Sequence, residues 1–91
     1  MGRVIKTSFK DAQGKTRFPD ILTKHRLIEI KTGMKKVGLT PQMRAYLDFC
    51  KKTGRKFELW LPSGGDVTGP LERAIIDAKG VIKKGMFKKY E

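Results

Sequence analysis

The sequence predicts a single α/β (α+β) domain, a mixed sheet flanked by helices, and three observations indicate this class. The chain has 91 residues, which suits one domain and leaves no room for a second. Three β-rich runs precede the first of two helical patterns. Each helical pattern is followed by another short β-rich run. The predicted order is therefore strand, strand, strand, helix, strand, helix, strand, which is typical of a mixed sheet with packed helices.

The strands are recognised as runs of β-forming residues between turn signals. The first strand is expected at 3–10, and the residues DAQG at 11–14 form the turn after it. The remaining strands are expected at 16–23, 26–32, 56–61 and 81–86.

The helices have recognisable starts. Thr40 and Pro41 are typical of the N-cap and first position of a helix, and Gly54 of its end. Apolar residues recur within this helix at the spacing of one face, namely Met43, Tyr46, Leu47 and Cys50. The residues TGP at 68–70 predict the start of the second helix in the same way.

The second and third strands are expected to form a hairpin that brings two acidic side chains together. A tight turn at 24–25 places Ile21 opposite Ile28 and Asp20 opposite Glu29. Facing Cβ atoms in such a ladder lie about 4.5–5.5 Å apart, so the two carboxylates would repel each other. A hard divalent cation such as Mg²⁺ or Mn²⁺ would offset that repulsion.

Strand alternation places Lys31 on the same face as Glu29, where it would hold and polarise an attacking water. Ile28 and Ile30 point the opposite way, and we expect their face to enter the core. Taken without their surroundings, the two acidic residues also fit simpler roles. Asp20 would then be a turn residue and Glu29 a solvated strand residue.

The dipeptide Pro19-Asp20, a short spacer and the triplet at 29–31 (EIK) resemble the PD-(D/E)XK nucleases, the restriction-endonuclease-like superfamily. Gln42 and Tyr46, four apart on the predicted helix, are similar to the Gln-x-x-x-Tyr element of some branches. The resemblance implies a restriction-endonuclease-like mixed sheet. It also implies hydrolysis of phosphodiester bonds, in DNA by preference or in tRNA, with Mg²⁺ or Mn²⁺ as the cofactor.

The resemblance implies catalytic roles for Asp20, Glu29, Lys31 and Gln42, with Asp20 and Glu29 as the metal ligands. Metal and lysine together would supply the nucleophile and stabilise charge on the phosphate. Superfamily members often carry a further acidic residue before the first strand, whereas this chain has none before Asp11. We therefore expect either a site that uses only two carboxylates or a domain excised from a larger protein.

The charge of the chain predicts a polyanionic partner. There are 21 Lys and Arg residues against 9 Asp and Glu, a net charge of +12. Nucleic acid is the first candidate and an acidic protein the second. We expect phosphate contacts from Lys35, Lys36 and Arg44. Tyr46 is expected to touch nucleic acid or, equally well, to be a core aromatic.

Several classes of protein are excluded by composition. A single cysteine, Cys50, excludes an internal disulfide and any multi-cysteine zinc site. A single histidine, His25, excludes metal motifs that need two, and we expect it in the hairpin turn. No run has the apolar character of a membrane-spanning segment or a signal peptide.

Two branches of the superfamily share stretches with this chain. Residues 18–80, including VTGPLERAI at 67–75, resemble the C-terminal toxin domains of bacterial polymorphic and contact-dependent inhibition toxins. The shorter stretch PDIL…IEIKTG…LTPQMRAYLDF resembles the VRR-Nuc nucleases of phage and repair proteins. We favour the toxin branch because its likeness reaches into the second half of the chain.

The toxin branch implies secretion within a larger toxin, action in the cytoplasm of a target cell and an acidic immunity protein as partner. Outside that setting we expect a cytoplasmic protein. Two alternatives stay open at this point. One is a non-catalytic basic domain that binds nucleic acid, and the other is a degenerate nuclease fold that binds proteins.

Overall fold

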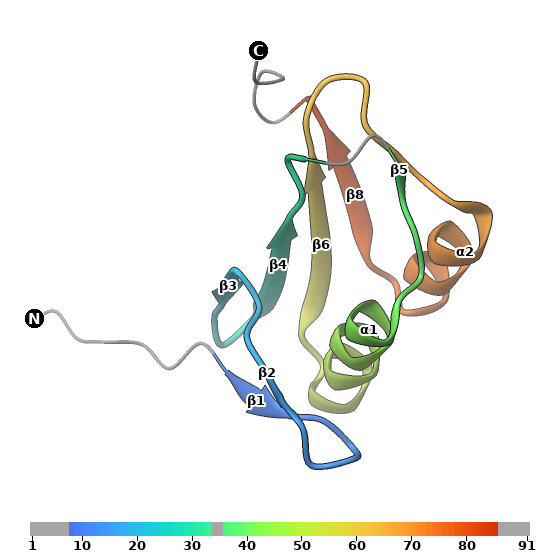
Figure 1. Cartoon of the computed structure of the whole chain (residues 1–91). Coiled ribbons are helices and arrows are strands. Elements are labelled where there is room, and N and C mark those ends of the chain that lie inside the picture. The colour runs from blue at the N-terminus through green and yellow to red at the C-terminus, as the bar shows by residue number, and fades with distance from the viewer. Residues whose placement is uncertain (1–7, 34–35, 86–91) are drawn as a thin grey trace, which may run out of the picture.

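A four-stranded mixed sheet forms the centre of the fold (Figure 1). The structure is a computed structural model and describes residues 8–33 and 36–85. The strands of this sheet are Ile21–Leu22 (β3), Arg26–Ile30 (β4), Lys56–Leu61 (β6) and Val81–Lys84 (β8). Their order is β3-β4-β6-β8, with β3 antiparallel to β4 and the other neighbours parallel. The predicted mixed α/β class is thus confirmed.

The hairpin of β3 and β4 has the predicted register. Ile21 pairs with Ile28, and Leu22 pairs with Leu27. The turn between the strands is fixed by Thr23, whose hydroxyl oxygen accepts the backbone N–H groups of residues 25 and 26 at 3.1 and 2.9 Å. The turn therefore lies where the sequence predicts it, with an exposed histidine in it.

The predicted strand at 16–23 is two short strands rather than one. Thr16–Arg17 (β2) pairs with Phe9–Lys10 (β1) in a separate hairpin, while β3 pairs with β4. The break contains Pro19, which has no backbone N–H to donate to a ladder. Of the first predicted strand, residues 3–7 lie outside the described residues.

The two helices, α1 (Pro41–Thr53) and α2 (Gly69–Asp77), begin where the sequence predicts. The hydroxyls of Thr40 and Thr68 each accept a backbone N–H from the first turn of their helix. A proline follows each cap at the start of the helix, where its missing N–H costs nothing. Gly54 ends α1 in the left-handed conformation, with φ of 78°.

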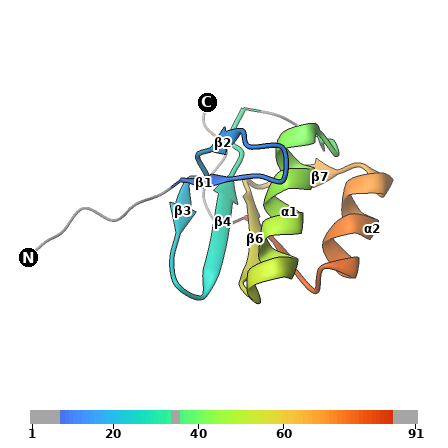
Figure 2. The same ribbon diagram turned by 90° about the horizontal axis from the view of Figure 1, so that it is seen from below.

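Both helices pack on one face of the sheet (Figure 2). Each helix connects two parallel neighbours, β4 to β6 and then β6 to β8. Because such crossovers are right-handed and both move along the sheet in the same direction, both helices arrive on the same side. One core cluster joins the two layers, with Leu27, Phe57, Leu59 and Leu61 from the sheet and Met43, Tyr46, Leu47, Cys50, Leu71 and Ile75 from the helices.

The face of β4 that enters this core cluster is the face of Glu29. Ile28 is buried as predicted, at 4% exposed, but on the opposite face and outside this cluster, and Ile30 there is half-buried. Leu27 is fully buried in the core cluster, and Glu29, two residues on, shares its side. The isoleucines point to the side without helices. The acidic side chain of Glu29 therefore borders the hydrophobic core.

The other side of the sheet, the helix-free face, carries Ile28, Ile30, Glu58, Trp60 and Lys83. Glu58 is only 4% exposed and is surrounded by donors. Trp60 Nε1 donates to it at 3.0 Å, and Lys83 Nζ lies 3.5 Å away. Burial alone would raise the pKa of Glu58, but these partners and the Arg26 guanidinium together lower it. The negative charge of Glu58 is thus compensated by neighbouring groups of the protein itself.

A short parallel pair lies outside the main sheet. Lys36–Val37 (β5) pairs with Asp66–Val67 (β7), two segments that are not among the strands predicted from the sequence. Neither α1 nor α2 is long and apolar enough to cross a membrane, and this finding covers only residues 8–33 and 36–85.

Candidate active site

Asp20 and Glu29 meet one residue before β3 begins, as the hairpin register predicts. The backbone N–H of Asp20 donates to Glu29 Oε1 at 3.3 Å. The backbone N–H of Ile30 donates to Asp20 Oδ2 at 2.7 Å. A regular ladder would place residue 19 opposite Ile30, but Pro19 begins no such pair. The carboxylate of Asp20 therefore takes the hydrogen bond at the point where strand pairing stops.

The negative charge of Glu29 is disfavoured by its surroundings. Its side chain lies on the core face and is 4% exposed. Burial raises the pKa of Glu29, and the negative charge of Asp20 raises it further, while the Asp20 N–H and Lys31 partly oppose the rise. A positive charge added between the two carboxylates would relieve both effects.

Lys31 connects the acidic pair to the helix layer. Its Nζ lies 3.3 Å from Glu29 Oε2 and donates to Gln42 Oε1 at 3.5 Å. Its backbone N–H donates to the carbonyl of Trp60 in β6 at 3.1 Å, so the residue stays attached to the sheet just after β4 ends. Gln42 lies in the first turn of α1. The structure thus brings together the four residues predicted to be catalytic.

Tyr46 lies directly behind this cluster. It is fully buried, and its hydroxyl donates to the carbonyl of Phe18 at 3.2 Å. Burial raises the pKa of Tyr46, and the nearby charges of Glu29 and Asp20 raise it further. A direct contact of Tyr46 with nucleic acid does not fit this burial. Its alternative role, a core aromatic whose hydroxyl holds the chain before Asp20, does fit.

Of the other predicted binding residues, the structure describes Arg44 and Lys36, and both are exposed. Arg44 is exposed, and it projects about 200° around α1 from Gln42 because each residue turns the helix by about 100°. Lys36 is exposed in β5, where it is the register partner of Asp66. Lys35 lies outside the described residues.

Phe18 is a residue of the site that the sequence patterns missed. Its ring is 69% exposed, two residues before Asp20, while its carbonyl is held by Tyr46. The only signal in the sequence is its place next to Pro19, because an exposed aromatic has no periodicity of its own.

The donor set fits a hard divalent cation. Mg²⁺ commonly binds through one or two carboxylates and completes its shell with water and substrate phosphate. Asp20 and Glu29 provide two such carboxylates, and burial and the charge of Asp20, which raise the pKa of Glu29, are both effects that a cation would oppose. In residues 8–33 and 36–85 there is no cluster of three or more His, Cys, Asp or Glu side chains suited to a metal. A metal here would depend on water or substrate for further ligands.

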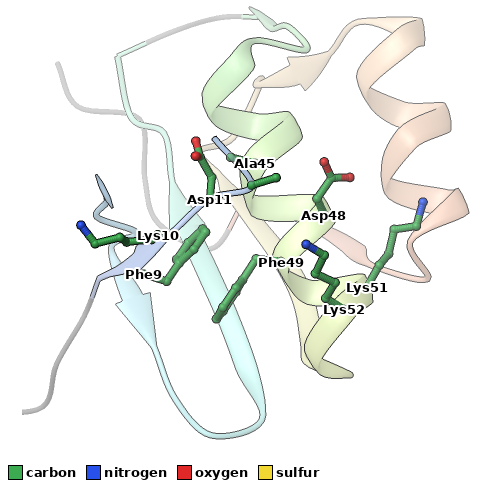
Figure 3. A pocket seen from close by; sticks show the side chains of 9 residues that line it. Phe9, Lys10, Asp11, Ala45, Asp48, Phe49, Lys51 and Lys52 are labelled. Carbon is green, nitrogen blue, oxygen red and sulfur yellow. The ribbon is translucent and has the colours of Figure 1, made fainter. Parts of the chain in front are cut away.

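A separate cavity of about 280 Å³ opens between the β1–β2 hairpin and α1 (Figure 3). The rings of Phe9 and Phe49 stack there with centroids 3.9 Å apart, and Phe9 also meets Tyr46 at 6.1 Å. The cavity is lined by none of the predicted catalytic residues. Through the contact of Phe9 with Tyr46, the β1–β2 hairpin packs against a residue that adjoins the site.

Comparison of the chain with family models, with curated proteins and with solved structures found no match.

Proposed function

We propose that the chain is a metal-dependent nuclease of the PD-(D/E)XK type, with a restriction-endonuclease-like arrangement of its sheet. The observation that carries this proposal is the convergence of Asp20, Glu29, Lys31 and Gln42. They come from β4, the chain on either side of the β3–β4 hairpin and the start of α1. A chain of three contacts joins them: Asp20 N to Glu29 Oε1 at 3.3 Å, Glu29 Oε2 to Lys31 Nζ at 3.3 Å, and Lys31 Nζ to Gln42 Oε1 at 3.5 Å. The packing of the fold does not require two carboxylates and a lysine to converge at one place, so their convergence favours a functional site.

Asp20 and Glu29 would hold the metal. A bound Mg²⁺ or Mn²⁺ would supply stabilisation of charge on the phosphate and a water of lowered pKa. The protein's own part is to fix these carboxylates. Asp20 is fixed by the N–H of Ile30 and Glu29 by the N–H of Asp20, so neither has to reorganise when substrate arrives.

Lys31 and Gln42 would act on the phosphate and the attacking water. The ammonium group of Lys31 lies beside Glu29 and would donate to a phosphate oxygen as negative charge develops there. The amide of Gln42 orients that ammonium through its Oε1. Attack of the water on phosphorus and loss of the ester oxygen would thus occur next to fixed donors.

The charge of the chain supports nucleic acid as the substrate class. A net charge of +12 attracts a polyanion and supplies affinity without sequence reading. DNA is the favoured substrate and tRNA the second. The same charge supports the second candidate function, a basic domain that binds nucleic acid without cutting it.

For the biological setting we propose the toxin branch, with a VRR-Nuc-type phage or repair nuclease as the alternative. Support comes only from the resemblance of the stretch at 67–75 to those toxin domains; in the fold this stretch caps α2 through its threonine and contributes a leucine and an isoleucine to the core. In that setting the partner would be an acidic immunity protein and the site of action the cytoplasm of a target cell.

A cleavage assay tests the nuclease. The protein is incubated with supercoiled plasmid and with total tRNA, each in Mg²⁺, Mn²⁺ or EDTA. We expect metal-dependent cutting that Glu29→Ala abolishes and that Asp48→Ala, which removes an exposed carboxylate of α1, preserves. Cutting that survives EDTA or Glu29→Ala contradicts the proposal. Binding without cutting by the folded protein favours the non-catalytic candidate.

A further inference from the structure

Phe18 is exposed, whereas the other aromatic residues between 8 and 85 that the structure describes are buried or half-buried. In the part of the chain that the structure describes, the large apolar side chains that are exposed are Phe18 at 69%, Ile76 at 66% and Ile21 at 36%. Phe18 is the aromatic among them. Single exposed apolar residues are common on protein surfaces. The exposure of Phe18 alone therefore indicates no function, whereas its position near Asp20 does.

The backbone that carries this ring is fixed on both sides. The Phe18 carbonyl accepts the hydroxyl of the fully buried Tyr46 at 3.2 Å. Pro19, the next residue, is buried and has a fixed φ. Asp20 is then held through its N–H and its carboxylate. The ring is thus presented by an ordered segment, which lowers the entropic cost of any contact it makes.

The ring also lies close to the acidic pair. Two residues span at most about 7 Å of chain, so the Cα atoms of Phe18 and Asp20 are no further apart than that. Phe18 and Asp20 are exposed and Pro19 between them is buried, so the two side chains share the solvent side of the segment. A phosphate bound by a metal that Asp20 and Glu29 hold would have its neighbouring base within reach of the ring.

We infer that Phe18 is a substrate-positioning residue whose ring stacks on an unpaired base next to the phosphate that a metal held by Asp20 and Glu29 would bind. This inference rests on the proposed function and narrows its substrate class. Bases inside a duplex already stack on both neighbours, whereas an unpaired base has a free face for an aromatic side chain. The substrate therefore carries an unpaired base beside the phosphate that is cut.

The test measures binding in Ca²⁺, a hard cation that takes carboxylate oxygens, so that the site is occupied and the readout is affinity rather than cleavage. Fluorescence anisotropy gives the affinity for a labelled single-stranded oligonucleotide and for the matching duplex, each as DNA and as RNA. We expect Phe18→Ala to weaken single-strand binding about 10-fold or more and to leave duplex binding unchanged. Phe18→Trp, which keeps an aromatic ring, should bind the single strand as tightly as the wild type does. Ile76→Ala, which removes an equally exposed apolar side chain from α2, should change neither.

Abasic oligonucleotides separate stacking from a general effect on the fold. Removing the base that contacts Phe18 should cost the wild-type protein as much affinity as Phe18→Ala does. The same abasic strand should cost the Phe18→Ala variant nothing more. Additive losses at every abasic position, or equal losses on single strand and duplex, would overturn the stacking role.

The outcome for Phe18 is separable from the outcome for the nuclease. A wild-type protein that cuts with metal but binds single strands equally well after Phe18→Ala would overturn the inference and leave the nuclease standing. A protein that never cuts but loses single-strand affinity in the predicted non-additive way would support Phe18 stacking and overturn the nuclease.

Discussion

The carboxylate of Asp20 accepts the backbone N–H of Ile30 at 2.7 Å, so a proposed metal ligand also ends the pairing of two strands. This double use follows from Pro19, which prevents the ladder from continuing. The chain thus obtains a fixed carboxylate at the place where regular structure stops. The two uses can be separated by substitution, because the hydrogen bond needs an oxygen and the metal needs a charge.

Asp20→Asn and Asp20→Ala should therefore differ in stability but not in activity. The asparagine oxygen still accepts the Ile30 N–H, so the free energy of unfolding should stay close to that of the wild type. Alanine loses this bond, which costs roughly 0.5–1.5 kcal/mol. Both variants should lose metal-dependent cutting because both lack the negative charge. Urea unfolding and the plasmid assay check this, and substantial activity in Asp20→Asn would contradict the metal-ligand role.

Glu29→Gln should stabilise the metal-free protein at neutral pH while abolishing its activity. The pKa of Glu29 is raised in the folded state, so the wild type is penalised as pH rises from the ordinary glutamate value through the raised value. The neutral amide avoids this penalty. We expect a gain of roughly 0.2–1 kcal/mol at neutral pH, which disappears at acidic pH. Thermal unfolding in EDTA across pH measures it.

Glu58→Gln is the matched control, because Glu58 is equally buried in the same sheet but faces the other way. Its pKa is lowered, so its carboxylate contributes stability above the ordinary glutamate value and loses it as pH falls through the lowered value. The variant should therefore be less stable than the wild type at neutral pH. It should keep its activity. The same sign of change in both variants would refute the electrostatic contrast between the two faces.

Lys31→Met should slow cutting roughly 10²–10³-fold, the typical loss when one preorganised donor to a developing charge is removed. Because the Lys31 side chain is partly exposed, the melting temperature should change little. Lys56→Met is the control, since Lys56 begins β6 at the end opposite the site and is exposed. Single-turnover rates with saturating metal compare the two. A Lys31→Met enzyme with an unchanged rate would remove lysine from the mechanism.

Tyr46→Phe should lower both stability and activity through one hydrogen bond. The ring keeps its packing in the core, while the Phe18 carbonyl loses its donor. We expect a loss of roughly 0.5–1.5 kcal/mol in the free energy of unfolding and a slower rate at saturating substrate. Urea unfolding and steady-state kinetics measure the two. A stability loss with an unchanged rate would mean that this bond supports the fold without positioning the site.

The parts that the sequence predicted well depend on local signals. The β3–β4 register follows from one tight turn, and both helix starts follow from a threonine–proline pattern that acts within a few residues. Since the turn set the register, the meeting of Asp20 and Glu29 followed from it. The acidic pair could be predicted from the sequence because the turn places Asp20 and Glu29, the two acidic residues of the motif, opposite each other.

The parts that failed depend on contacts remote in sequence or on function. Ile28 and Ile30 read as the core face of β4 by hydrophobicity, yet that face has no helix over it because both crossovers run the same way. Glu29 lies on the buried face at an electrostatic cost, which local rules would not favour. The pairing of β5 with β7 joins segments about a helix and a strand apart, and two residues of strand leave no periodicity to detect.

The order of the sheet also determines what its two borders can do. β3 has only two residues, and β8 ends in Lys83 and Lys84, both exposed. A short border strand and one with adjacent lysines are poor templates for a strand from another molecule. The sheet therefore resists edge-to-edge aggregation at both borders, even though one of its faces has no helical cover.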